Sequence, residues 1–277
     1  MPMQPGTQAV TPELRDWIVA QFRAGCAPDD ILKAMRASGW EDAVARMALA
    51  QALPGALPTA PPPGPDLVAA PTVLQLPDRE VTVLLSLQHP RLVLLGGFLS
   101  EDECDALIAL SRPRMARSQT VDRQSGGSEV NDARTSDGMF FERGEAPLVR
   151  RIEQRIAALL RWPVEHGEGL QVLRYRPGAQ YRPHFDYFDP AHPGTAAVLR
   201  QGGQRLATLL MYLQAPQRGG ATVFPDAGLQ VSPAKGHALF FSYESPDPST
   251  GTLHGGAPVL AGEKWVATKW LREGAYG

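Results

Sequence analysis

Hydrophobic and polar positions follow three different patterns along the chain. In residues 11–50 apolar residues recur every three or four positions, which is typical of amphipathic helices. The apolar face of the first of these helices is predicted to hold Leu14, Trp17, Ile18 and Phe22. Thr11 suits the cap of that helix and Pro12 its first turn. We therefore predict a small module of three short helices over residues 1–52, which would serve packing, dimerisation or a protein interaction.

A different pattern fills residues 53–72, "LPGALPTAPPPGPDLVAAPT". Seven of these twenty residues are proline. Such a segment favours extended backbone and has too few apolar side chains for a core. It predicts a semi-rigid linker between two domains.

From residue 73 onward, short apolar runs bounded by turn residues predict strands, and two longer amphipathic stretches predict helices. The predicted strands are 79–87, 91–99, 169–175, 205–213, 221–225, 237–243 and 264–271, and the predicted helices are 101–111 and 146–162. Many short strands with a few helices indicate a mainly β domain over 73–277, a sandwich or barrel with helices packed outside it. Its core is expected over 168–273.

Charge and cysteine content narrow the possible partners and the compartment. The chain carries 27 basic and 29 acidic residues, a formal net charge of -2, which gives no electrostatic reason to expect nucleic acid or an anionic membrane as partner. No apolar run approaches the ~18 residues of a membrane span. The start, MPMQPGTQAV, lacks the basic and apolar regions of a signal peptide, and the two cysteines form no disulfide framework. These features predict a reduced, cytoplasmic protein.

The candidate chemistry centres on "RYRPGAQYRPHFDYF", residues 174–188. His184 and Asp186 are two positions apart, so on a strand both side chains point to one face. His254, beside a Gly-rich turn, is a candidate third ligand. Two histidines and a carboxylate suit the open sites of non-haem Fe(II) oxygenases, and the same ligands also occur in zinc hydrolases.

A lysine separates these two interpretations. Lys264 follows His254 by ten residues, on a predicted strand that ends the domain. A lysine buried in a barrel is costly unless an anion meets it. Together with the hydroxyls of Tyr175 and Thr208 on neighbouring strands, Lys264 would suit the distal carboxylate of a small diacid, which zinc hydrolysis does not require. The alternative is that Lys264 is an exposed residue at a strand end.

The segment from about 92 to 273 resembles the prolyl 4-hydroxylase family of 2-oxoglutarate- and Fe(II)-dependent dioxygenases. The resemblance is carried by "RTSDGMFF" (134–141), by 173–188, by 202–243 and by "HGGAPVLAGEKWVATKWLRE" (254–273). It implies a double-stranded β-helix (jelly-roll) core and hydroxylation of a substrate C–H bond, with O2 consumed and succinate and CO2 released. It also implies Fe(II), the cosubstrate 2-oxoglutarate, and ascorbate.

The resemblance assigns expected roles to individual residues. The iron ligands would be His184, Asp186 and His254; 2-oxoglutarate would be bound by Lys264, Tyr175 and Thr208; and the substrate side would hold Tyr181, Trp270, Arg134, Thr135, Ser136 and Arg200. The expected substrate is a prolyl residue in a peptide or protein, because aromatic walls suit a proline ring. A groove with a mobile loop near 120–135 would favour a peptide.

Two alternatives remain open at this point. The same chemistry could act on a free amino acid or another small molecule, since the cofactor motifs do not distinguish these substrates. A binding or scaffold protein with a decayed oxygenase domain is a more distant alternative, which the intact set of His184, Asp186, His254 and Lys264 argues against.

Overall fold

The computed structural model describes residues 10–53, 62–118, 120–121, 127–129 and 133–277. The chain divides into two compact units, Met1–Pro62 and Pro63–Gly277. In the described ranges both cysteines are free thiols. None of the helices in these ranges has the length and apolar character needed to cross a membrane.

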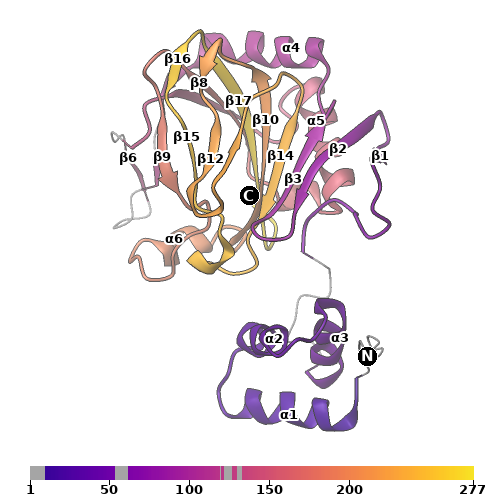
Figure 1. Cartoon of the computed structure of the whole chain (residues 1–277). Coiled ribbons are helices and arrows are strands. Elements are labelled where there is room, and N and C mark those ends of the chain that lie inside the picture. The colour runs from indigo at the N-terminus through magenta and orange to yellow at the C-terminus, as the bar shows by residue number, and fades with distance from the viewer. Residues whose placement is uncertain (1–9, 54–61, 119, 122–126, 130–132) are drawn as a thin grey trace. The chain divides into compact units, whose positions relative to one another are not determined.

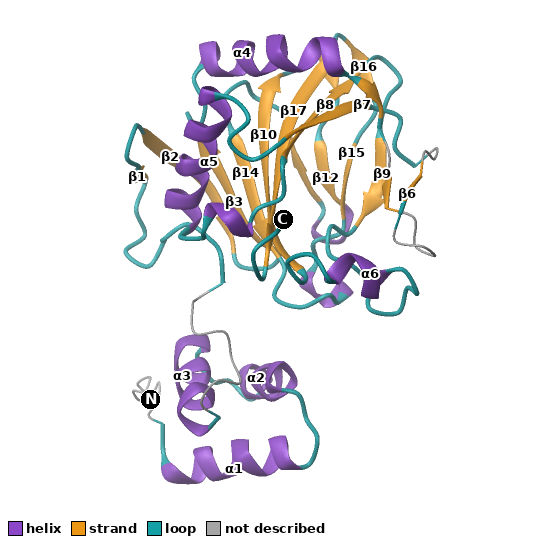
Figure 2. Ribbon diagram, turned by 180° about the vertical axis from the view of Figure 1, so that it is seen from behind, coloured by secondary structure: helices purple, strands orange, loops and turns teal. Residues whose placement is uncertain are grey.

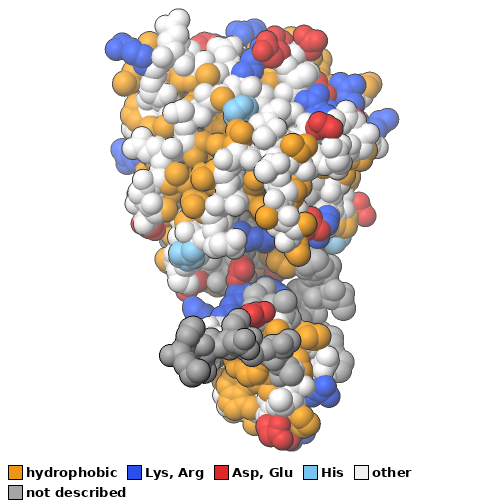
Figure 3. All heavy atoms as spheres, turned by 45° about the vertical axis from the view of Figure 1, so that its right-hand side comes forward, with side chains coloured by type: hydrophobic (Ala, Val, Ile, Leu, Met, Phe, Trp, Pro, Cys, Tyr) orange, Lys and Arg blue, Asp and Glu red, His pale blue; other side chains and the backbone are white. Residues whose placement is uncertain are grey.

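The first unit contains three short helices, α1 (Pro12–Arg23), α2 (Pro28–Ala37) and α3 (Asp42–Ala52) (Figure 1). Thr11 caps α1 by accepting a hydrogen bond from the backbone N–H of Leu14 at 3.3 Å. The core consists of Leu14, Ile18, Ile31, Leu32, Met35, Ala45, Ala48 and Leu49. Trp17 and Phe22, which the periodicity places on the same face, are 40% and 45% exposed, because they flank the row formed by Leu14 and Ile18. Hydrophobic side chains are accordingly visible on the surface of this unit (Figure 3).

The second unit is built on antiparallel strands. They are β1 (Val73–Gln75), β2 (Glu80–Leu87), β3 (Arg91–Gly96), β4 (Ala116–Arg117), β5 (Thr120–Val121), β6 (Ser128–Glu129), β7 (Asp137–Phe141), β8 (Leu170–Tyr175), β9 (Tyr181–His184), β10 (Arg205–Gln214), β11 (Arg218–Gly219), β12 (Thr222–Phe224), β13 (Leu229–Val231), β14 (Ala238–Ser242), β15 (His254–Gly256), β16 (Val259–Ala261) and β17 (Lys264–Arg272). Nine of them form one sheet in the order β1-β2-β3-β14-β10-β17-β8-β7-β4, and four form a second in the order β13-β12-β15-β9. The two sheets face each other (Figure 1), which is the double-stranded β-helix that was expected.

Three helices accompany the sheets: α4 (Glu101–Ser111), α5 (Pro147–Leu160) and the short α6 (Thr195–Leu199). Helices α4 and α5 lie against the outer face of the large sheet (Figure 2). Strand β17 is therefore buried on both faces, and all nine of its residues are inaccessible. Its alternate residues divide between the two sides: Trp265 and Ala267 join the core under the helices, whereas Val266 joins the core between the sheets.

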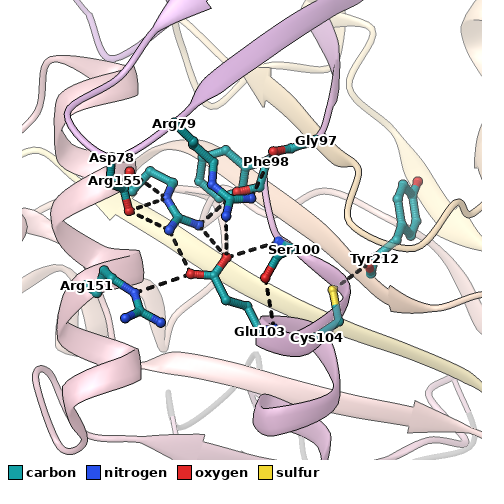
Figure 4. A network of polar contacts seen from close by, with 10 residues as sticks. All are labelled: Asp78, Arg79, Gly97, Phe98, Ser100, Glu103, Cys104, Arg151, Arg155 and Tyr212. Carbon is teal, nitrogen blue, oxygen red and sulfur yellow. Dashed lines mark hydrogen bonds and ion pairs between the residues drawn. The ribbon is translucent and has the colours of Figure 1, made fainter.

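A buried ion network joins α4 to α5 (Figure 4). The guanidinium of Arg155 binds both carboxylate oxygens of Glu103, at 2.8 and 2.9 Å, and Nε of Arg155 binds Asp78 at 3.0 Å. Arg79 adds a second guanidinium at 3.1 Å from Glu103. Glu103 also accepts a hydrogen bond from the backbone N–H of Ser100 and completes the capping box of α4. The network fixes both helices to the turn that precedes β2.

Part of the predicted linker belongs to the second unit. Residues 63–65 are buried, and the N–H of Gly64 donates to the backbone oxygen of Leu160 at 2.9 Å. A Cβ at Gly64 would lie 2.4 Å from Nη2 of Arg91, so this close approach suits glycine. The remaining prolines of the linker fall largely in residues 54–61, which lie outside the described residues.

Candidate metal centre

Two strands of the small sheet bring His184, Asp186 and His254 together. His184 is the last residue of β9 and His254 the first of β15, and the two are direct partners in the antiparallel register. Asp186 lies just beyond β9, where its carboxylate reaches both rings: Oδ1 is 3.4 Å from Nε2 of His184 and Oδ2 is 3.5 Å from Nε2 of His254. One ligand atom from each residue lies within 4.8 Å of the others. Among the described residues, no other group of three such side chains could hold a metal ion.

Both imidazoles are held with the same nitrogen toward this cluster. Nδ1 of His184 lies 2.9 Å from the backbone oxygen of Arg182, and Nδ1 of His254 lies 2.9 Å from that of Thr252. A carbonyl oxygen only accepts hydrogen bonds, so each Nδ1 carries the proton and each Nε2 presents a lone pair. This arrangement fits a metal ion, because metal-binding histidines are commonly oriented by such a bond.

The protonation states agree with a metal site. Burial alone would raise the pKa of Asp186, but the imidazoles of His254 and His184 and the guanidinium of Arg205 outweigh it and bring that pKa well below its usual range. Burial lowers the pKa of His254 to about 4, against the opposing effect of Asp186. An ionised carboxylate beside a neutral imidazole is the state that metal binding requires.

A cavity of about 460 Å³, counted to its open mouth, adjoins the cluster and contains Lys264 at its wall. Lys264 is 3% exposed, and its ammonium lies 5.5 and 5.8 Å from the ring centroids of Tyr175 and Tyr212. Within the part of the chain that the structure describes, no carboxylate pairs with it. Burial lowers the pKa of Lys264 to about 8. A buried ammonium beside an open cavity fits an anionic ligand.

The hydroxyl groups around the cavity differ from the expected set. Tyr175 and Thr208 both line it, but the hydroxyl of Thr208 donates to Asp186 Oδ2 at 2.6 Å. Thr222 also lines the cavity, and its oxygen accepts a hydrogen bond from the Tyr212 hydroxyl at 2.8 Å, which leaves the Thr222 hydrogen available. Thr222 pairs with Gly256, and a Cβ placed on Gly256 would lie 3.9 Å from the Lys264 nitrogen. Thr222 therefore lies close to the ammonium, a position that only the sheet register reveals.

Three of the residues expected on the substrate side line the cavity. The ring of Tyr181 stacks on His184 with centroids 3.6 Å apart, and the guanidinium of Arg134 lies 5.0 Å from the centroid of Tyr181. Arg134 is buried and donates to Gln171 at 2.7 Å. Trp270 forms another part of the wall.

The other three lie elsewhere. Thr135 is hydrogen-bonded through its backbone and side chain to Gln180, and Ser136 is fully buried against the hydroxyl of Ser118 at 2.9 Å. Arg200 is exposed at the end of α6. Of the loop predicted near 120–135, residues 122–126 and 130–132 lie outside the described residues.

Arg205, which the sequence did not single out, lies nearer the cluster. Its guanidinium is 3.9 Å from the centroid of Trp270, binds Glu168 at 2.6 Å and donates to the backbone oxygen of Asp186 at 3.3 Å. It therefore supports both the cavity wall and the turn that carries the carboxylate.

Two facing antiparallel sheets that hold a two-histidine, one-carboxylate cluster beside a buried lysine define the class of 2-oxoglutarate- and Fe(II)-dependent oxygenases. The model of the 2OG-Fe(II) oxygenase superfamily matches residues 170–272. Probable prolyl 4-hydroxylase 3 of Arabidopsis thaliana is 42% identical over 209 residues, which is 68% of this chain and 71% of that protein. Prolyl 4-hydroxylase 1 of the same plant is 43% identical over 203 residues, covering 67% of this chain and 70% of that protein.

A solved structure agrees with these relatives. The 2-oxoglutarate complex of a viral collagen prolyl hydroxylase from Paramecium Bursaria Chlorella virus-1 is 33% identical, with a TM-score of 0.51, over 65% of this chain and 95% of that one. The chain belongs to the prolyl 4-hydroxylase family of 2-oxoglutarate- and Fe(II)-dependent dioxygenases. It is therefore a dioxygenase that uses Fe(II), 2-oxoglutarate and O2, as the sequence predicted.

Proposed function

We propose that this dioxygenase hydroxylates prolyl residues in a peptide or protein. The observation that carries the proposal is the pair of aromatic side chains, Tyr181 and Trp270, that line the cavity beside His184. Flat aromatic faces suit the ring of proline, and the mouth of the cavity is open. The similar proteins named prolyl hydroxylases support the same substrate class.

In this proposal, His184, Asp186 and His254 hold Fe(II), which, when bound, supplies the oxidation of a substrate C–H bond by O2 coupled to decarboxylation of 2-oxoglutarate. Nδ1 of each histidine keeps its proton on a backbone carbonyl, so the two rings stay neutral and oriented. Lys264 pairs with the distal carboxylate of 2-oxoglutarate.

Hydroxyl groups complete the cosubstrate site. Thr222 can donate its free hydrogen to the same carboxylate, since its oxygen already accepts from Tyr212. Tyr175 lines the cavity beside Lys264, and burial raises the pKa of Tyr175, so its hydroxyl remains protonated and able to donate. The cosubstrate would thus be bound by one cation and two hydroxyls.

On the substrate side, Arg205 supports Trp270 from behind, and Arg134 stacks on Tyr181. These contacts hold the aromatic walls in place before the substrate arrives, which lowers the cost of ordering them on binding. The proposal includes L-ascorbate as the reductant that keeps the metal as Fe(II). A cytoplasmic location stays a prediction.

The test is to incubate the full chain with Fe(II), 2-oxoglutarate, ascorbate and a set of proline-containing peptides, and to measure peptide mass and succinate. We expect a mass gain of one oxygen per modified peptide, located on proline by fragmentation. It should match the succinate formed and be absent in His184→Ala and in a peptide with alanine in place of proline. Oxygen incorporation into free proline or another small molecule, with every peptide unmodified, would contradict the proposal and favour the small-molecule alternative.

A further inference from the structure

We propose that Thr208 is a positioning residue for Asp186, the proposed iron ligand, and that Tyr243 acts through Thr208. The Thr208 oxygen lies 2.6 Å from Oδ2 of Asp186 and 3.1 Å from the hydroxyl oxygen of Tyr243. All three side chains are buried, with exposed fractions of 1% for Thr208, 2% for Tyr243 and 6% for Asp186. The inference rests on iron binding in the proposed function and does not depend on the identity of the substrate.

The direction of each hydrogen bond follows from the carboxylate. Ionised Asp186 can only accept, so the single hydroxyl hydrogen of Thr208 is donated to it. The oxygen of Thr208 then accepts, and the Tyr243 hydroxyl must be the donor. The result is a relay of fixed polarity from Tyr243 through Thr208 to Asp186.

This relay is incompatible with the role that the sequence suggested for Thr208. A hydroxyl has one hydrogen, and that of Thr208 is already used at 2.6 Å. It has none left to donate to a carboxylate of 2-oxoglutarate. Thr222 on β12 has a free hydrogen, and it is the better candidate for that contact.

The relay also selects one oxygen of the carboxylate. Among the hydroxyls of the described residues, that of Thr208 is the one that reaches Asp186, and it binds Oδ2, while Oδ1 remains toward His184. A carboxylate held through one oxygen is less free to rotate or to bind a metal through both oxygens. Thr208 itself is held rigidly, since it pairs with Phe241 of β14 on one side and with Trp270 of β17 on the other.

The experiment measures metal affinity without cosubstrate or peptide. Mn(II) alone is titrated into the apo-protein, and free Mn(II) is followed by electron paramagnetic resonance. Thr208→Val keeps the shape of the side chain and removes the hydroxyl, and it should weaken the Mn(II) Kd by about 10- to 100-fold, the usual effect of losing a group that orients a metal ligand. Thr208→Ser, which keeps the hydroxyl, should restore the Kd to within a few-fold of wild type.

Two further variants separate positioning from other effects. Tyr243→Phe should weaken Mn(II) binding less than Thr208→Val, and the double variant should bind no more weakly than Thr208→Val alone, because Tyr243 acts only through Thr208. Thr222→Val is the matched control from the same cavity: its Mn(II) Kd should equal that of wild type, while its affinity for 2-oxoglutarate falls.

The outcomes decide the proposal directly. A Mn(II) Kd within twofold of wild type in Thr208→Val refutes it, as does independent, additive weakening by Tyr243→Phe. If Thr208→Val does not fold, Thr208→Ser and Tyr243→Phe still test the relay: tight binding by the first and weaker binding by the second supports it, and equal Kd values overturn it. Because no peptide is present, absence of prolyl hydroxylation leaves this result unaffected.

Discussion

Replacing Lys264 with methionine should stabilise the cofactor-free protein and at the same time weaken its binding of 2-oxoglutarate. Lys264 is 3% exposed, and burial lowers its pKa from 10.5 to about 8. That lowering corresponds to a destabilisation of about 3 kcal/mol at pH values below 8, where the ammonium is charged in both the folded and the unfolded state. Methionine of similar length carries no charge, so the free energy of unfolding should rise by up to about that amount.

The pH dependence gives this prediction its sign. Between about pH 8 and pH 10.5 the unfolded chain holds the Lys264 proton and the folded protein does not, so the stability of wild type relative to Lys264→Met increases as the pH rises. The two melting temperatures should be furthest apart near pH 7 and should converge toward pH 10. Calorimetry of both proteins without metal or cosubstrate, at matched pH values, measures this difference.

The loss of function follows from the same buried position. With methionine at 264, the distal carboxylate of 2-oxoglutarate would be buried without a partner, which costs about 3–5 kcal/mol, on the order of a hundredfold or more in Kd. Anaerobic titration with Fe(II) and then 2-oxoglutarate, followed through the visible charge-transfer band, gives this Kd. A Lys264→Met variant that melts below wild type at pH 7, or one that binds 2-oxoglutarate as wild type does, would refute the reasoning.

Two other predictions concern separate parts of the molecule. Trp270→Leu should raise the peptide KM by about tenfold or more, as for a central aromatic contact, with the Kd of 2-oxoglutarate unchanged; steady-state kinetics with the two substrates varied in turn checks this, and equal effects on both would count against a substrate wall. Glu103→Gln should lower the free energy of unfolding by about 3 kcal/mol at pH 7, because the buried guanidinium of Arg155 loses its charged partner. Burial would raise the pKa of Glu103, but Arg155 outweighs it and lowers that pKa below 4.5. The difference in denaturant midpoint between wild type and Glu103→Gln should therefore be full above pH 4.5 and shrink as the pH falls, and a constant difference would contradict the role of the charge.

The sequence predicted the elements with long, regular patterns and missed the shortest ones. Strands β10 and β17, of ten and nine residues, are found where the apolar runs placed them, as are α4 and α5. Strands β9 and β15 have four and three residues, too few for a period to be recognised, although they carry the two histidines.

The candidate site could be predicted in its residue types and only partly in their contacts. His184, Asp186, His254 and Lys264 were identified from spacing and resemblance, and the structure brings all four to one cavity. Which of several hydroxyls faces the cosubstrate depends on hydrogen bonds between strands that are distant in sequence. The interior position of Ser136 also depends on long-range packing, which no local pattern of polar residues reports.

The direct pairing of His184 with His254 constrains how this chain can change over time. An ion bound by both rings would fasten two short strands whose ligands are separated by 70 positions in the sequence. A single residue inserted within β9 or β15 would turn the following side chains to the opposite face and remove one ligand. The intervening segment bears no such restriction, because a loop can lengthen at little entropic cost as long as its ends still meet. Insertions and deletions that preserve activity should therefore accumulate between these strands and be excluded from them, so that the two shortest ligand-bearing strands tolerate the least variation in length.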